Sequence, residues 1–359
     1  MRSIVPAVVA SLLLATLAAC GGGETGGGGG TTPARSYRMG FSAFPSRLDA
    51  TVLLNGIDQW SQRAELAIIH EELPWTELLA GAAPAAIIDA HYGSLVALYR
   101  SKGLRLVYIG DLTDGLSRGQ DAPQLRALGR SITEPAVQAL YRSFVVAVDR
   151  KLKPEYIGLA AETNFTRIAA PAPLYAAVVA TTNAAAADLR AGGTTATLFV
   201  SVQVETAWGL LQGTSYVGID ADRRDFPFMQ MLGLSSYPFL TYADPDNIPV
   251  DYYRRVVSSA ALPAMVVEGG WASASVANIV SSAATQARYI TRHGELLDSV
   301  SAIGVIQLDF ADVDLAALPP PLPAELALFA SIGLVDTNYR PKPALAVWDA
   351  LHARPLAAR

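Results

Sequence analysis

The sequence predicts an α/β protein with a (β/α)8 fold, the TIM barrel, because eight short apolar runs alternate with longer segments of helical periodicity. The apolar runs lack strict polar and apolar alternation, which is typical of parallel strands buried on both faces. The predicted strands are residues 39–42, 66–69, 104–108, 156–159, 198–202, 231–234, 265–267 and 302–306.

The segments between the strands are rich in good helix formers and predict helices over residues 86–101, 134–152, 174–189 and 274–293. A doubly wound open sheet is the main alternative, and it requires a glycine-rich phosphate loop after its first strand. The glycine-rich segment of this chain precedes every predicted strand, so it does not meet that requirement.

The N-terminus has the pattern of an export signal. Arg2 is followed by an apolar run over residues 4–17, which is too short to span a bilayer as a mature helix. The run ends in Leu-Ala-Ala-Cys20, which resembles the bacterial lipobox, and Cys20 is the only cysteine. The resemblance implies a signal peptide over residues 1–19 and lipidation of Cys20, and an ordinary secretory signal is the alternative.

Residues 20–35 are expected to form a flexible linker, because a stretch so rich in glycine buries too little apolar area to become ordered. One domain is predicted over residues 36–359, since the alternating pattern continues to the C-terminus. We therefore expect an exported protein, lipid-anchored at the periplasmic face or the surface of a bacterial membrane.

Composition argues against several other classes of protein. The net charge of −5 provides no basic footprint for nucleic acid. The histidines are scattered, at His70, His91, His293 and His352, and do not form a metal-ligand set. There is also no Gly-x-Ser-x-Gly elbow. We expect no metal, no cofactor and a monomeric protein whose partners are a carbohydrate and the lipid bilayer.

The catalytic residues of such barrels lie at the carboxyl ends of the strands. Glu162 follows the fourth predicted strand and Glu268 the seventh, so the two carboxylates are expected to converge across the barrel mouth. Cleavage of a glycoside with retention needs two carboxyl groups about 5–5.5 Å apart, one protonated and one ionised. This predicts Glu162 and Glu268 as a catalytic pair, with salt bridges at the barrel rim as the alternative role.

Two short motifs resemble the retaining clan A glycoside hydrolases. Val267-Glu268-Gly269-Gly270-Trp271 resembles the nucleophile motif of endo-β-1,4-galactanases and related β-glucanases, and residues 234–239 resemble their Ser-Tyr-Tyr-Pro segment. In this family the acid/base and the nucleophile lie on strands four and seven, so the resemblance implies that Glu162 is the acid/base and Glu268 the nucleophile. It also implies that Tyr237 hydrogen-bonds the nucleophile. Residues 333–344 look like the closing segment of many such enzymes.

The strand-four motif departs from this family, in which an asparagine that binds the sugar 2-hydroxyl precedes the acid/base. Here Ala161 occupies that position, and Asn164 is the candidate to reach the same space. The other predicted substrate-binding residues are Tyr237, Trp271, Trp75, His70, Gln203, Glu205 and Asp309. The aromatic rings are candidates to stack on sugar faces, and Glu205 is the alternative catalytic carboxylate.

The sequence therefore predicts a retaining β-glycoside hydrolase that acts on extracellular or periplasmic poly- or oligosaccharide by double displacement. A non-catalytic cell-surface glycan-binding lipoprotein with the same barrel is the alternative. The missing asparagine before Glu162 favours this alternative.

Overall fold

The computed structural model describes residues 33–358. The predicted signal peptide, Cys20 and nearly all of the predicted linker lie outside the described residues. Within the described part of the chain, no helix is both long enough and apolar enough to cross a bilayer.

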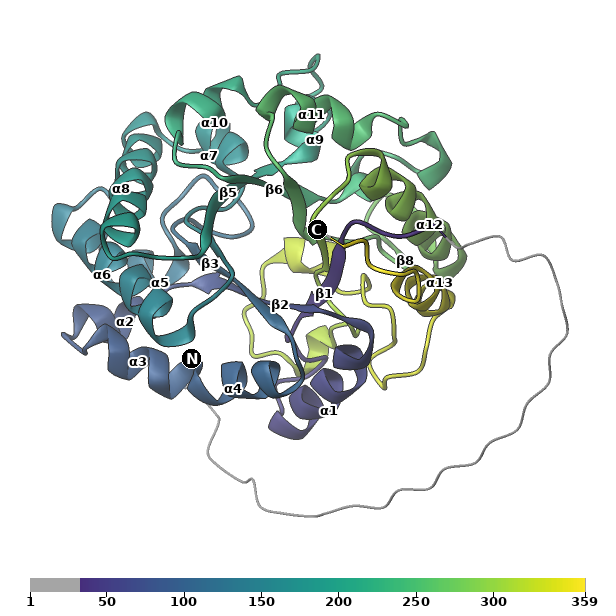
Figure 1. The fold of residues 1–359 in the computed structure, drawn as a ribbon, viewed down its shortest axis with the longest axis horizontal. Helices are drawn as coiled ribbons and strands as arrows, with labels where there is room; N and C mark the ends of the chain where they lie inside the picture. Colours follow the sequence, from purple (N-terminus) through teal and green to yellow (C-terminus); the bar gives the residue numbers. More distant parts are fainter. Residues whose placement is uncertain (1–32, 359) are drawn as a thin grey trace, which may run out of the picture.

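The fold is a closed barrel of eight parallel strands, in the order β1-β2-β3-β4-β5-β6-β7-β10 (Figure 1). The strands are β1 (Arg38–Ser42), β2 (Leu66–Glu72), β3 (Arg105–Asp111), β4 (Tyr156–Gly158), β5 (Thr197–Gln203), β6 (Met231–Ser236), β7 (Ala264–Gly269) and β10 (Gly304–Gln307). The predicted fold class is therefore confirmed, with each strand at a predicted apolar run.

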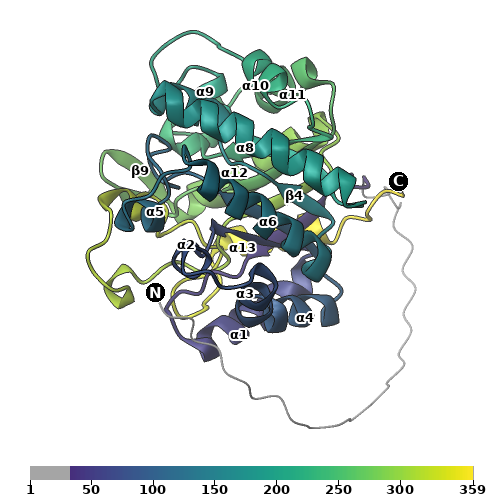
Figure 2. The same ribbon diagram turned by 90° about the vertical axis from the view of Figure 1, so that its left-hand side faces the viewer.

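Helices surround the barrel, and the turned view shows α6 and α8 side by side on its outside (Figure 2). Arg142 of α6 and Asp188 of α8 join these two helices by an ion pair. The helices of the described residues are α1 (Ala50–Trp60), α2 (Trp75–Leu79), α3 (Pro84–His91), α4 (Gly93–Ser101), α5 (Pro123–Ala127), α6 (Pro135–Leu152), α7 (Thr163–Ala169), α8 (Ala172–Ala191), α9 (Val204–Ala207), α10 (Asp220–Asp225), α11 (Tyr252–Ala260), α12 (Ala283–Ser299) and α13 (Pro343–His352).

Two predicted helices differ from the structure. The segment 86–101 forms two helices, α3 and α4, that meet at Tyr92. The segment 274–293 begins instead with a hairpin of β8 (Ala274–Val276) and β9 (Ile279–Ser282). Helix α12 starts only at Ala283, because Ser282 caps it by accepting a hydrogen bond from the Thr285 backbone N–H.

Side chains of alternate strand residues point into the barrel or outward against the helices. Inside the barrel, Leu66, Ile68, Val107 and Ile109 belong to one buried apolar cluster. Continuing the same alternation along β2 and β3 brings His70 and Asp111 inward at the carboxyl ends, where they contact each other. The strands therefore supply a packed apolar core inside the barrel and polar side chains at their carboxyl ends, at the barrel mouth.

Arg35, the last residue of the predicted linker, packs against the folded domain. The Arg35 backbone N–H donates to Pro355 O at 2.9 Å, and its side chain is only 3% exposed. The Arg35 guanidinium pairs with Glu65 and donates to the Tyr37 and His352 carbonyls. Arg35 thereby ties the start of the domain to its C-terminal segment.

Candidate active site

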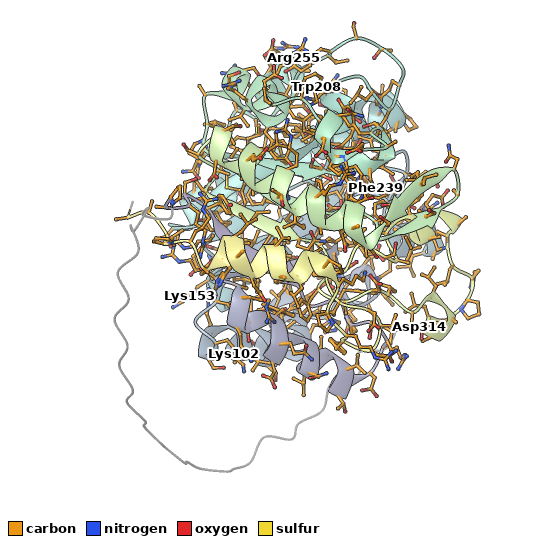
Figure 3. The ribbon with its side chains drawn as sticks, turned by 90° about the vertical axis from the view of Figure 1, so that its right-hand side faces the viewer. Lys102, Lys153, Trp208, Phe239, Arg255 and Asp314 are labelled. Atoms are coloured by element: carbon orange, nitrogen blue, oxygen red, sulfur yellow. The ribbon has the colours of Figure 1, made fainter. Side chains whose placement is uncertain are left out.

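A cavity of about 520 Å³ opens at the carboxyl ends of the barrel strands. Figure 3 shows the two ends of the barrel: Phe239 and Asp314, which follow strands, lie on the right, and Lys102 and Lys153, which precede strands, lie on the left. Six of the predicted site residues line the cavity: His70, Glu162, Gln203, Tyr237, Glu268 and Asp309. These six are therefore brought together by the fold.

Glu162 follows β4 and is held in an unusual backbone conformation. Its φ of 47° is left-handed, which costs a non-glycine residue about 1–2 kcal/mol. Its backbone N–H donates to Ser201 Oγ at 2.9 Å. The Ser235 hydroxyl donates to Oε1 at 2.6 Å and Arg118 Nε donates to Oε2 at 2.9 Å. Strained backbone of this kind tends to occur where the surroundings fix a functional side chain.

A β-bulge directs Glu268 into the cavity. Val267 belongs to the inner apolar cluster, so regular alternation would turn the next side chain outward. The pairing of β6 with β7 shifts register at this point, where Leu234 pairs with Val266 but Ser235 pairs with Glu268. Bulges of this type re-aim a side chain and are frequent beside active sites.

Two side chains contact the Glu268 carboxylate. The Tyr237 hydroxyl donates to Oε1 at 2.8 Å, and His70 Nδ1 lies 3.4 Å from Oε2, an ion-pair distance if His70 is protonated. Burial raises the pKa of Glu268 above its usual value and the charge of Glu162 raises it further, whereas His70, Arg118 and the Tyr237 hydrogen bond only partly oppose this rise. The negative charge of Glu162 thus acts directly on Glu268.

His70, Asp111 and Arg118 form a polar bridge between the two glutamates. His70 Nε2 is 3.3 Å from Asp111 Oδ2, and Arg118 hydrogen-bonds both Asp111 and Glu162. Burial lowers the pKa of His70, but the hydrogen bond to Asp111 and the charges of Glu268 and Asp111 outweigh burial, so that this pKa is raised. Burial would raise the pKa of Asp111, yet Arg118 and His70 lower it to about 2.

Arg118 was not among the predicted site residues. Its side chain is 1% exposed although it lies in the loop between β3 and α5, where an arginine is ordinarily solvated. The only signal in the sequence is a cation a few residues beyond the carboxyl end of a barrel strand. That signal does not distinguish a buried arginine from an exposed one.

Asn164 does not lie in the predicted position. Its amide Nδ2 donates to Gln203 O and its Oδ1 accepts from Gln203 N, both at 2.8 Å. These bonds clamp the start of α7 to the end of β5, and the side chain does not line the cavity. Asn164 therefore does not replace the asparagine that is missing at Ala161.

Glu205 lies behind the cavity wall. It is fully buried and accepts hydrogen bonds from the Tyr252 hydroxyl at 2.8 Å and the Tyr237 backbone N–H at 2.9 Å. Burial raises its pKa to about 7. Since it is not among the lining residues, its position does not fit substrate binding or the role of alternative catalytic carboxylate, but supports the backbone that carries Tyr237.

The two predicted tryptophan platforms are also internal. Trp75 is 0% exposed and Trp271 is 1% exposed, and neither lines the cavity. The Trp271 ring packs against Tyr289, with ring centroids 5.1 Å apart, and its Nε1 donates to Ser281 Oγ. The prediction that these rings stack on a sugar is therefore not supported.

Asp309 does reach the cavity, just beyond β10. Burial raises the pKa of Asp309 to about 8, and the charges of Asp312 and Glu268 contribute to this rise. This rise favours the protonated form of the carboxyl group, which can donate a hydrogen bond to a ligand hydroxyl. Within residues 33–358, no cluster of three or more potential metal ligands is present.

No protein family model and no curated protein sequence matches the chain. Among solved structures, an exo-β-1,4-mannosidase from Opitutaceae bacterium strain TAV5 matches with a TM-score of 0.63 and 17% identity, over 89% of this chain and 61% of that chain. Xylanase 10B from Thermotoga maritima matches with a TM-score of 0.57 and 11% identity, over 88% and 95%. A β-glucuronidase from an uncultured Clostridium sp. matches with a TM-score of 0.57 and 11% identity, over 89% and 53%.

The chain spans about half to three fifths of the length of the glucuronidase and the mannosidase. At these low identities the likeness is one of fold, and it agrees with the closed parallel barrel described above. The chain therefore shares the (β/α)8 barrel fold of these structures.

Proposed function

We propose that the protein is a retaining β-glycoside hydrolase that acts on carbohydrate outside the cytoplasm, with Glu268 as nucleophile and Glu162 as acid/base. One observation carries the proposal. Glu162, which follows the fourth barrel strand, and Glu268, near the carboxyl end of the seventh, line one cavity, and the Tyr237 hydroxyl donates to Glu268. The glycosidase-like barrel supports it.

The proposed reaction has two displacements. In the first, a Glu268 oxygen attacks the anomeric carbon while the bond to the leaving oxygen breaks and Glu162 transfers its proton to that oxygen. In the second, Glu162 removes a proton from water, which attacks the anomeric carbon and releases Glu268. Tyr237 holds the attacking carboxylate in place through its 2.8 Å hydrogen bond.

Arg118 suits an acid/base residue that alternates between two charge states. When Glu162 carries its proton, Arg118 still has the Asp111 carboxylate as a partner. The buried guanidinium is therefore never left unpaired, a state that would cost several kcal/mol, on the order of 3–5.

A glycan-binding protein without turnover is the second candidate, and two observations favour it. Ala161 stands where clan A enzymes have an asparagine, and Glu162 forms an ion pair with Arg118. A carboxylate paired with a guanidinium has no proton to donate, so the substrate would have to shift this pairing before the first step.

The test is hydrolysis of a panel of aryl β-glycosides, which carry activated leaving groups and differ only in the sugar. Wild type, Glu268→Ala and, as a matched control, Glu295→Ala, which changes an exposed glutamate outside the cavity, are compared. We expect turnover of at least one sugar by wild type, loss of turnover in Glu268→Ala, and retained turnover in the control. Binding of glycans without any turnover would support the second candidate.

A further inference from the structure

Part of the cavity lining is apolar. Six of its lining residues form what we call the apolar wall: Phe44, Leu48, Leu53, Val313, Leu326 and Phe329. The proposed catalytic residues line the same cavity together with His70, Glu71 and Asp309. A ligand that fills the cavity therefore meets hydrocarbon as well as carboxyl and imidazole groups.

Apart from Leu53, which lies in helix α1, the apolar wall is built from two loops that are joined to each other. Phe44 and Leu48 follow β1, and Val313, Leu326 and Phe329 follow β10, the strand next to β1 in the barrel. The Asp314 backbone N–H donates to Ser46 O at 2.9 Å, and Arg47 pairs with Asp314 at 3.0 Å. These contacts hold the two loops together as one surface.

The apolar wall also reaches the catalytic centre. The Phe329 ring packs edge-on against the Tyr237 ring, with centroids 4.9 Å apart, and Tyr237 donates to Glu268. At the outer end, the Phe44 and Leu48 side chains are 44% and 50% exposed. Hydrocarbon thus extends from the nucleophile to the cavity mouth, where it remains open to solvent.

We propose that the leaving group of the substrate is an apolar alkyl or aryl aglycone, and that the apolar wall binds it. This inference rests on the proposed function, and it narrows the substrate from poly- and oligosaccharides to glycosides of hydrophobic alcohols or phenols. Four of the six side chains in the apolar wall are leucine or valine, which offer a second sugar neither a hydrogen bond nor a flat ring. The Phe329 ring already packs against Tyr237, which leaves Phe44 as the exposed aromatic ring of the wall. Covering this hydrocarbon surface with an apolar group removes it from water, which is favourable. A cavity of about 520 Å³ also suits one small ligand.

The experiment compares methyl, butyl and octyl β-glycosides of whichever sugar the aryl panel identifies, below micelle-forming concentrations. A disaccharide with the same non-reducing sugar is the fourth substrate. We expect kcat/KM to rise at least about tenfold from methyl to octyl, since each buried methylene favours binding severalfold. Equal values along the series, or a preference for the disaccharide, would overturn the inference while leaving the proposed hydrolase intact.

A matched pair of variants tests whether the apolar wall causes the expected preference for octyl over methyl glycosides. Leu48 and Leu54 are both 50% exposed, but only Leu48 lines the cavity. Leu48→Ser should lower the octyl-to-methyl ratio of kcat/KM severalfold, and Leu54→Ser should leave this ratio at the wild-type value. An unchanged ratio in Leu48→Ser, alongside a steep wild-type series, would show that the apolar wall is not the aglycone site.

If no glycoside is hydrolysed, the proposed function is wrong. A binding measurement then tests separately whether the apolar wall binds an apolar ligand. Octyl and methyl β-thioglycosides of each sugar in the panel are then titrated into wild type and Leu48→Ser in a calorimeter. Tighter binding of the octyl compound, weakened by Leu48→Ser, supports an apolar-ligand site. Absence of octyl thioglycoside binding overturns it.

Discussion

Arg118 donates one hydrogen bond to Glu162 and another to Asp111, so a single buried guanidinium connects the proposed acid/base to the residue that contacts His70. His70 in turn lies 3.4 Å from Glu268. The two glutamates are therefore linked by a continuous series of charged groups as well as by their shared cavity. A change in the charge of one member of this series should therefore change the electrostatic environment of the other members.

His70 provides a pH test of this series. Its pKa is raised in the folded protein, so its protonated form stabilises the native state fully at pH values below its ordinary pKa of about 6.5. That stabilisation is lost as pH rises through the folded-state pKa. His70→Gln should therefore reduce the free energy of unfolding more at pH 5.5 than at pH 9, as measured by urea denaturation. A pH-independent difference would contradict a protonated His70 between two carboxylates.

Tyr237→Phe removes the hydroxyl that donates to Glu268 while keeping the ring that packs against Phe329. We expect kcat to fall by about 10–100-fold, because an oriented hydrogen bond to the attacking group is lost, with little change in melting temperature. Tyr253→Phe is the control, since its hydroxyl bonds Ser236 and does not line the cavity. Similar losses of kcat in both variants would mean that the Tyr237 contact has no special role.

The contacts of Arg35 predict that residues before Ser36 contribute to the stability of the domain. Arg35→Met should lower the free energy of unfolding by about 2–4 kcal/mol, because Glu65 loses a buried charge partner. Burial would raise the pKa of Glu65, but hydrogen bonds from His352 and Arg35 lower it to about 2. The stabilisation is therefore present above the ordinary pKa of about 4.5 and disappears as pH falls toward 2.

The matched control for Arg35 is Arg105→Met, which changes an exposed arginine on β3. Thermal or urea unfolding at pH 7 and pH 3 measures both variants against wild type. The Arg35 defect should be larger at pH 7 than at pH 3. If Arg35→Met is as stable as Arg105→Met at pH 7, the domain does not depend on residues before Ser36.

We also propose that Cys20 is lipidated and anchors the exported protein, as its lipobox-like context predicts. Cys20→Ser removes the only thiol in the chain, so it should move the protein from washed membranes into the soluble fraction of the expressing bacterium. Immunoblotting of the two fractions measures this. Equal membrane retention of the variant would exclude an anchor at Cys20.

Regular periodicity explains which features were predictable from the sequence. The eight strands were found because buried parallel strands leave uninterrupted apolar runs, and Glu162 and Glu268 were singled out because each follows such a run. Side-chain direction after a strand is set by local events that the pattern does not encode. The bulge beside Ser235 turns Glu268 inward, whereas the short helix α9 buries Glu205 behind Tyr237.

The proposed roles of the two glutamates differ in a way that product stereochemistry detects. Glu268→Ala lacks the attacking group, so azide can enter the vacated space and attack the anomeric carbon directly. The expected product is a glycosyl azide of inverted configuration. Glu162→Ala keeps the nucleophile but lacks the acid, so an aryl glycoside with a good leaving group still forms the covalent intermediate. Azide then attacks that intermediate and yields a product of retained configuration.

Each of these substitutions should lower turnover of a natural glycoside by several orders of magnitude, on the order of 4–8 kcal/mol of transition-state stabilisation. The aryl glycoside should be far less affected in Glu162→Ala than in Glu268→Ala, because its leaving group needs no proton. Nuclear magnetic resonance of the azide products assigns their configuration. Inverted product from Glu162→Ala and retained product from Glu268→Ala would instead show that Glu162 is the nucleophile and Glu268 the acid/base. The ion pair of Glu162 with Arg118 would then explain that result.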